Sequence, residues 1–345
     1  VALAVMLSLV LNGFLTGLYR QITSYLEHSA ATIVVAEEDV TNLLGVSSLL
    51  PETAADRVEV IRDVDRAIPI LSQFVILDLH GKKQPVYLIG YDPSLGGGPW
   101  DMAAGREPAR KNELVMDRIL AQRHGLALGD TVEVLGKDLV IVGLSNGTTS
   151  WMTSFIFVRK KEAETLLLLP GKSSFLLVST ASGADRDEIM RRINRQDGVN
   201  AVLKMEMEKN DLRLFSKVFS APLKLMVVIS FLVGTMVVGL VIYTLTIERR
   251  REYGVMKAIG ASNGVLYRVV LAQAVTAAVL GAALGILLAY GLSAWIMLVR
   301  PQFLIYLEPR MFGWAAGSGL AMALIAALFP ASLLARLAPA EVFRR

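Results

Sequence analysis

The sequence contains no cysteine, which excludes disulfide bonds, thiolate catalysis and cysteine-ligated metal sites. Histidine is scarce as well, with only His28, His80 and His124. These three lie far apart, and no two of them have the four-residue spacing that places two metal ligands on one helix face. We therefore expect surface histidines, no metal site and no cofactor bound by this chain.

Charged residues make up only 19% of the chain, against about 25% in an average soluble domain. Four runs contain no charged residue, and the length of each is close to or above the roughly 20 apolar residues that a helix needs to cross a bilayer. Without charge inside these runs, proton- or ion-coupled transport is not expected. The charge-free runs predict an integral membrane protein with four transmembrane helices, and they cover residues 1–19, 225–247, 269–299 and 311–335.

The apolar character begins at Val1, without the basic segment that opens a signal peptide. We therefore expect that the native protein has a further cytoplasmic segment before this residue. The formal net charge of +4 comes from scattered residues or from residues that flank apolar runs. Orientation in the membrane explains such a pattern, so nucleic acid is not an expected partner.

Lysine and arginine concentrate after the second apolar run and at the C-terminus. By the positive-inside rule these two regions face the cytoplasm, which also places both termini inside. The expected transmembrane segments are 1–19, 223–247, 265–299 and 311–335. The expected outer segments are 20–222 and 300–310, and the cytoplasmic segments are 248–264 and 336–345.

The large outer segment predicts a folded domain of mixed α+β class. Short β-rich runs alternate with turn signals such as "HGKK" and "DPSLGGGP". The strands are expected to begin near Thr32, Phe74, Pro85, Asp130, Asp138, Ser154 and Ser174, and helices near Pro51, Arg159 and Gly183. The order of the strands in the sheet does not follow from the sequence.

Two amphipathic stretches flank this domain, "GLYRQITSYLEHSAA" and "KMEMEKNDLRLFSKVFSAPLK". We interpret them as helical stalks between the domain and the membrane, with plain tethers as the alternative. Pro222 should kink or interrupt the second stalk, because proline lacks the N–H group and clashes with the preceding turn.

The segment "ERRREYGVMKAIGAS", residues 248–262, is the most informative of the chain. As a helix it places Val255, Ala258 and Ile259 on one face, with Tyr253 and Met256 on another. Gly260 predicts the helix end. A basic anchor at the membrane surface explains the arginines alone, whereas a short helix with an apolar face also suits a groove on a soluble partner.

The pattern R-R-R-E-Y-G-V-M-K-A-I-G-A-S resembles the signature of the FtsX-like permease family, the membrane subunits of MacB-type ABC transporters. Residues 105–144 resemble the core of that family's extracytoplasmic domain, and "LLARLAPAEVFRR" resembles its cytoplasmic terminus. The order of one span, a large domain and three further spans also agrees with the family.

This resemblance implies a type VII ABC transporter of the bacterial cytoplasmic (inner) membrane. A homodimer or pseudo-dimer of permeases would bind two separate ATPase subunits, which carry ATP and Mg²⁺, and a periplasmic adaptor or an extracellular effector is a further partner. Motion of the coupling helix would reach the outer domain by mechanotransmission. The expected ATPase-coupling residues are Arg249, Arg250, Arg251, Glu252, Tyr253, Met256, Lys257, Ile259 and Gly260.

Small residues recur at four-residue spacing in the last two spans, at Gly281 and Gly285 and again at Gly313 and Gly317. Such faces let helices approach closely in lipid. We expect packing within the chain, with dimer contact as the alternative. Gln273, an amide inside a span, is expected to form a helix–helix hydrogen bond.

The chain is not expected to be an enzyme. The segment "LPGKSS" has Leu166 where a Walker A loop requires its first glycine, so we expect a turn between helix and strand there. The leading hypothesis is ATP-driven export or extraction (efflux) of an amphiphilic or lipid-like, drug-like or haem-like cargo, for which His28 would be an alternative haem ligand. The rivals are a mechanotransmitter that regulates an outer partner such as a cell-wall hydrolase, and a ligand sensor without an ATPase.

Overall fold

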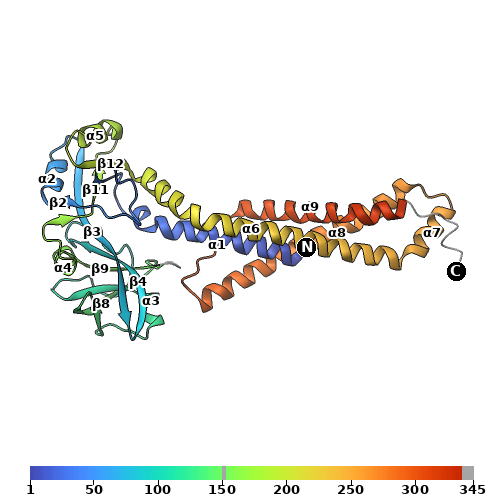
Figure 1. The fold of residues 1–345 in the computed structure, drawn as a ribbon, viewed down its shortest axis with the longest axis horizontal. Helices are drawn as coiled ribbons and strands as arrows, with labels where there is room; N and C mark the ends of the chain where they lie inside the picture. Colours follow the sequence, from blue (N-terminus) through green and yellow to red (C-terminus); the bar gives the residue numbers. More distant parts are fainter. Residues whose placement is uncertain (150–152, 336–345) are drawn as a thin grey trace. The chain divides into compact units, whose positions relative to one another are not determined.

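The computed structural model describes residues 1–149 and 153–335, with no description of the side chains of 329–335 (Figure 1). The expected cytoplasmic tail at 336–345 therefore lies outside the described residues. The chain divides into two compact units. We call Val1–Gly17 with the residues from Val218 onward the helical unit, and Leu18–Lys217 the sheet unit.

Two long helices, α1 (Ala2–Glu27) and α6 (Lys204–Glu248), each contribute residues to both units. Pro222 was expected to kink or interrupt α6; α6 runs through Pro222 as one helix, so an interruption there is wrong. Proline removes only its own N–H hydrogen bond, and the turns on either side keep theirs. The helical unit also contains α7 (Arg250–Ala258), α8 (Asn263–Val299) and α9 (Pro309–Ala335).

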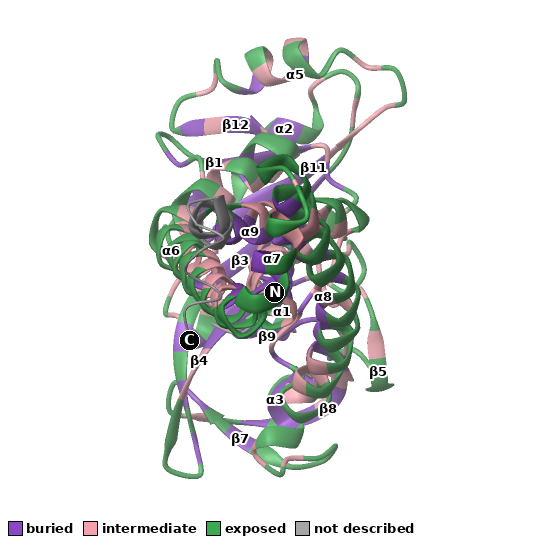
Figure 2. Cartoon of the chain, turned by 90° about the vertical axis from the view of Figure 1, so that its right-hand side faces the viewer, coloured by how far each residue is buried: buried purple, intermediate pink, exposed green. Residues whose placement is uncertain are grey.

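Four helices are long and apolar enough to cross a membrane: α1, α6, α8 and the described part of α9 up to Leu328. Much of their surface is apolar and exposed in the isolated chain, as on α8, which is largely green in Figure 2. Such helices, hydrophobic beyond the face they bury, are typical of transmembrane spans. The fold class is therefore membrane α-helical with a mixed α+β domain between the first two spans.

The sheet unit is built on a mixed sheet in the order β12–β1–β11–β3–β4–β9–β6–β8–β5, with β7 paired to β8. A second sheet pairs β10 with β2. Most neighbours are antiparallel, but β4–β9 and β6–β8 are parallel. The strands are β1 (Ile33–Glu37), β2 (Leu50–Pro51), β3 (Val64–Leu79), β4 (Lys82–Tyr91), β5 (Met102–Gly105), β6 (Glu113–Asp117), β7 (Thr131–Val134), β8 (Lys137–Ser145), β9 (Ser154–Arg159), β10 (Lys172–Ser173), β11 (Phe175–Thr180) and β12 (Val199–Leu203). The helices are α2 (Thr53–Glu59), α3 (Arg118–Arg123), α4 (Lys160–Leu166) and α5 (Arg186–Ile193).

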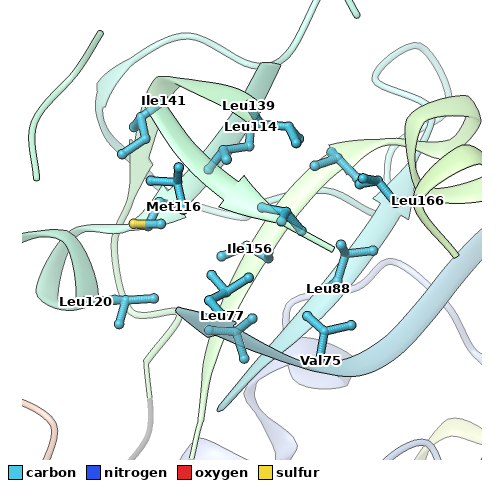
Figure 3. Packing of buried hydrophobic residues seen from close by; sticks show 14 of the residues in the cluster. Val75, Leu77, Leu88, Leu114, Met116, Leu120, Leu139, Ile141, Ile156 and Leu166 are labelled. Carbon is cyan, nitrogen blue, oxygen red and sulfur yellow. The ribbon is translucent and has the colours of Figure 1, made fainter. Parts of the chain in front are cut away.

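β3 contributes to two hydrophobic cores within the described part of the sheet unit. Its first half pairs with β11, and Ala67 packs in a core with residues of α2 and α5. Its second half pairs with β4, and Leu71, Val75 and Leu77 pack in the other core (Figure 3). That core also takes Met116 and other residues from β6, β8 and β9.

In the helical unit, two glycines of α8 allow the beginning of the chain and α1 to lie close to α8. A Cβ on Gly281 would lie 2.7 Å from the Val1 side chain, and one on Gly285 would lie 2.7 Å from the Ala2 carbonyl oxygen. Both contacts are within the chain. Gly313 and Gly317 on α9 differ, because a Cβ at either would meet no atom within 4 Å. Their face is open in this single chain.

The loop between α8 and α9 also depends on glycine. The Tyr306 N–H donates to the Gly13 carbonyl of α1, at 2.9 Å. A Cβ on Gly17 would lie 1.8 Å from the Leu304 carbonyl oxygen, so the loop backbone can approach α1 only because this residue is glycine.

A carboxylate closes the turn before β6. Glu113 accepts from the Arg106 guanidinium at 2.8 Å and from the backbone N–H groups of Ala109 and Arg110 at 2.8 and 2.9 Å. The bond with Arg106 is the main cause that lowers the Glu113 pKa to about 2. This network fixes residues 106–113.

We expect Glu113→Gln to destabilise the sheet unit by about 1.5–3 kcal/mol at pH 7, the range for hydrogen bonds to a charged group. Because the folded pKa lies below the unfolded value, the contribution is present above about pH 4.5 and is lost as the pH falls towards 2. Thermal unfolding of the full chain in detergent between pH 7 and pH 2 measures this. Glu38→Gln, at an exposed loop position after β1, is the control; equal acid sensitivity in wild type and Glu113→Gln would contradict the prediction.

Candidate functional site

α7 is a short helix between two candidate membrane spans, and its end is set by a glycine. Gly260 has φ +96°, a left-handed conformation that glycine adopts without strain. The Gly260 N–H donates to the Lys257 carbonyl at 3.1 Å, and the Ala261 N–H donates to the Met256 carbonyl at 2.9 Å. These two bonds form a Schellman motif, which satisfies the last carbonyls of α7 before α8 begins at Asn263.

One face of α7 anchors the helix. Tyr253 is buried and packs in a cluster with Ile242 of α6 and Leu266 of α8, and Met256 packs against the same cluster. These two residues therefore hold α7 in place, and neither lies on the exposed face. Gly254 is buried beside Tyr253.

The opposite face is apolar and exposed. Val255 is 42% exposed and Ile259 is 81% exposed, with exposed Ala258 beside them. Val255 is absent from the coupling set expected from the sequence, although its spacing to Ile259 puts both on one face. Of that set, the exposed members are Arg249, Arg250, Arg251, Glu252, Ile259 and Gly260, whereas Lys257 is half-buried.

The beginning of α6 carries a second constellation, which the sequence analysis missed. Met207 and Asp211 lie one turn apart and are both buried within the sheet unit. One carboxylate oxygen of Asp211 accepts from the backbone N–H groups of Leu43 and Leu44, each at 3.1 Å. The Tyr87 hydroxyl of β4 donates to the Leu43 carbonyl at 2.8 Å. We call this contact of Asp211 with Leu43 and Leu44 the α6 joint.

The α6 joint contains a buried group that titrates, the carboxyl group of Asp211. Asp211 precedes the charge-free run 225–247, so it lies outside the membrane-spanning segment of α6. Burial raises the pKa of Asp211 to about 7, and the nearby Glu208 adds to the rise, while the two backbone donors oppose it. The carboxyl group therefore changes charge near neutral pH.

No candidate metal site emerges within residues 1–149 and 153–335. No group of three or more histidine or acidic side chains is placed to hold an ion there. His28 stacks on Trp100, with ring centroids 4.8 Å apart, and its Nδ1 lies 2.7 Å from the Ser24 carbonyl oxygen. The segment "LPGKSS" begins in the turn that follows α4 and then enters β10 at Lys172, which agrees with the predicted turn between helix and strand.

Two family models match this chain. The MacB-like periplasmic core domain matches residues 1–196, and the FtsX-like permease C-terminal domain matches residues 224–339. Together they cover most of the sequence, and the first alone covers more than half of it.

Several named proteins are similar. An ABC transporter permease of Mycobacterium tuberculosis H37Rv is 26% identical over 283 residues, which is 82% of this chain and 77% of the relative. The hemin transport system permease protein HrtB of Staphylococcus haemolyticus is 24% identical over 300 residues, 86% of this chain and 81% of the relative. The macrolide export ATP-binding/permease protein MacB of Chromobacterium violaceum is 30% identical over 130 residues, 38% of this chain and 20% of the relative.

Among solved structures, the periplasmic region of MacB from Actinobacillus actinomycetemcomitans aligns with a TM-score of 0.40 at 10% identity, covering 52% of this chain and 94% of that one. The extracellular domain of the transporter YknZ aligns with a TM-score of 0.39 at 13% identity, covering 50% of this chain and 99% of that one.

We expect Gly260→Ala to open the end of α7, because a left-handed conformation costs a residue with a Cβ about 1–2 kcal/mol. The Ala261 amide should then exchange hydrogen about 5–30 times faster. Hydrogen exchange with mass spectrometry in detergent measures this. Gly264→Ala is the matched control, since Gly264 lies in the first turn of α8 without a positive φ; equal exchange in the two variants would count against the role of Gly260.

We expect Asp211→Ala to weaken the α6 joint by about 2–4 kcal/mol, because two buried N–H donors lose their acceptor. Asp211→Asn keeps an acceptor oxygen and should therefore lose less stability than Asp211→Ala.

The joint should also depend on pH. Since the pKa of Asp211 is raised in the folded state, wild-type stability falls as the pH rises from about 4 to 7, and Asp211→Asn should not show this fall. Exchange of the Leu43 and Leu44 amides, corrected for intrinsic pH dependence, tests both points; a pH dependence that persists in Asp211→Asn would refute the assignment.

Proposed function

Because the chain belongs to the MacB/FtsX-type ABC transporter permease family and is a multi-pass membrane protein, we propose that it couples ATP hydrolysis by a separate ATPase subunit to work outside the cytoplasmic membrane. In this proposal the chain hydrolyses no ATP, and ATP and Mg²⁺ belong to the partner. Two ATPase subunits would serve a dimer of permeases, with both termini and α7 on the cytoplasmic side.

The observation that carries the proposal is that α7 has one buried face that anchors it and one exposed face that is apolar. Tyr253 fixes the helix to α6 and α8, while Val255 and Ile259 present an apolar strip with Arg251 and Glu252 beside it. A helix anchored on one side and apolar on the other is the arrangement that docks into a groove of a partner. A membrane anchor alone would not require the buried tyrosine or the fixed helix end at Gly260.

We further propose mechanotransmission along α6. This helix leads directly to α7 at its C-terminal end and carries the α6 joint near its N-terminal end. A displacement of α7 by the ATPase would move α6, and Asp211 would pass the motion to the segment that contains Leu43 and Leu44. The buried contact suits this role because its rupture leaves buried donors unpaired, which makes slipping costly.

The proposal for the cargo rests on the names of two relatives and on the apolar character of the spans. The relatives named for hemin transport and for macrolide export handle large amphiphilic molecules. An amphiphilic or lipid-like, drug-like or haem-like cargo also agrees with spans that carry no charge in their apolar runs, since such a cargo can enter from the side. A periplasmic adaptor would complete the export route.

We expect Ile259→Asp to abolish capture of the ATPase, because an exposed apolar contact at the centre of an interface is worth about 2–4 kcal/mol. The full chain, affinity-tagged and isolated in detergent from its own organism, is analysed by mass spectrometry for a co-purifying P-loop ATPase. Val60→Asp is the control, since Val60 of the sheet unit is 83% exposed, close to the 81% of Ile259.

The coupling role is supported if Ile259→Asp inserts normally into the membrane but loses the ATPase, while Val60→Asp still captures it. Capture that survives Ile259→Asp would remove α7 as the docking element. A wild-type chain that brings down no ATPase at all would sink the proposed function and would favour a sensor.

A further inference from the structure

A cavity of about 270 Å³ lies beside the C-terminal end of α1 within the sheet unit. Its walls come from α1, from β3 and β11, and from the loop between β4 and β5. Of its lining residues, Tyr25 and Tyr91 are buried, whereas His28, Leu95 and Glu107 are exposed. The cavity therefore has a buried aromatic part and a part that solvent reaches.

Aromatic rings form much of the wall. Trp100 stacks on His28 with an interplanar angle of 10°, and it meets Tyr25 edge-on with centroids 6.3 Å apart. Behind Trp100 lie Phe155 and Phe157, whose rings contact it edge-on and hold it in place. The rigid ring assembly gives the cavity a fixed shape and a surface of π-electron density.

The lining carries a carboxylate. Among the described residues that line the cavity, Glu107 is the only acid, His28 is the other ionisable side chain apart from the tyrosines, and there is no lysine or arginine. The Tyr91 hydroxyl donates to Glu107 at 3.1 Å and so orients the carboxylate. Burial, together with the charge of Glu107, raises the pKa of Tyr91, which keeps this hydroxyl protonated as a donor.

Consecutive glycines bring the loop over the cavity. Gly96 and Gly97 have φ values of +102° and +84°, which favour glycine. A Cβ on Gly98 would lie 2.2 Å from the Tyr91 ring, so only glycine allows the loop to pass this closely. The Tyr25 hydroxyl donates to the Gly97 carbonyl at 2.7 Å and ties the loop to α1. The cavity is thus a built feature of the fold.

We propose that this cavity binds a small organic cation, an amine or quaternary ammonium group on an apolar body. Aromatic faces with a nearby carboxylate are the arrangement that recognises such cations. An anion would meet the Glu107 carboxylate without a lysine or arginine among the described lining residues to compensate it. The cavity volume, slightly below the roughly 300–1,000 Å³ of pockets for drug-sized ligands, fits a compact molecule.

The test uses the full chain in maltoside detergent, without any ATPase, so its result does not depend on the proposed function. Choline and its uncharged isostere 3,3-dimethylbutan-1-ol are compared by saturation-transfer NMR titration. We expect choline to bind and the alcohol to bind more weakly. Glu107→Gln, which keeps the shape and the acceptor for Tyr91, should weaken choline about fivefold, the upper range for an exposed ion pair.

Trp100→Leu should weaken choline to a similar extent through the lost cation–π contact. Glu133→Gln on β7, an exposed carboxylate outside the cavity lining, should leave binding unchanged. The proposal is overturned if the alcohol binds as well as choline, if Glu107→Gln binds choline like the wild type, or if neither probe binds. Circular dichroism of each variant confirms that the chain is folded, and Glu107→Gln alone decides if Trp100→Leu is not.

Discussion

The α6 joint is the contact on which the arrangement of the sheet unit around its second long helix depends. One oxygen of Asp211 accepts hydrogen bonds from two backbone N–H groups of a segment about 170 residues earlier in the chain. The Tyr87 hydroxyl donates to a carbonyl of the same segment. A buried carboxylate is costly without partners, which ties the position of the helix to that of the loop. Local helix propensity cannot create such a link; only the closed tertiary structure can.

Glycine sets how closely the elements of the helical unit approach one another. Gly281 and Gly285 let α1 lie against α8, and Gly17 admits the backbone of the loop that follows α8. Membrane helices lack a hydrophobic force that would drive them together in lipid, so such close approach provides the van der Waals contact that replaces it. Gly313 and Gly317 have the same spacing but face open space in the single chain. Spacing alone therefore does not distinguish a face that packs within the chain from one that stays open in it.

Local patterns predicted much of the fold, and non-local contacts explain what escaped. Charge-free runs indicated four long apolar helices, Gly260 indicated the end of α7, and short β-rich runs bounded by turn signals indicated most strands. The first half of β3 was missed because Pro69 interrupts its pattern, and β12 because its partner β1 lies far away in sequence. At the candidate site, the sequence pointed to α7 but not to the inward turn of Tyr253 or to Asp211. Both depend on which neighbours the fold supplies.

β3 has a consequence for how this domain can change over time. Because one strand runs through both cores, an insertion or deletion near Ile70 would shift the pairing of its two halves relative to each other and turn core side chains outward. The parts of the sheet unit on either side of Ile70 therefore share the strand β3 and cannot be exchanged between relatives as independent modules. Variation in length should instead accumulate in the loops, where it does not interrupt β3.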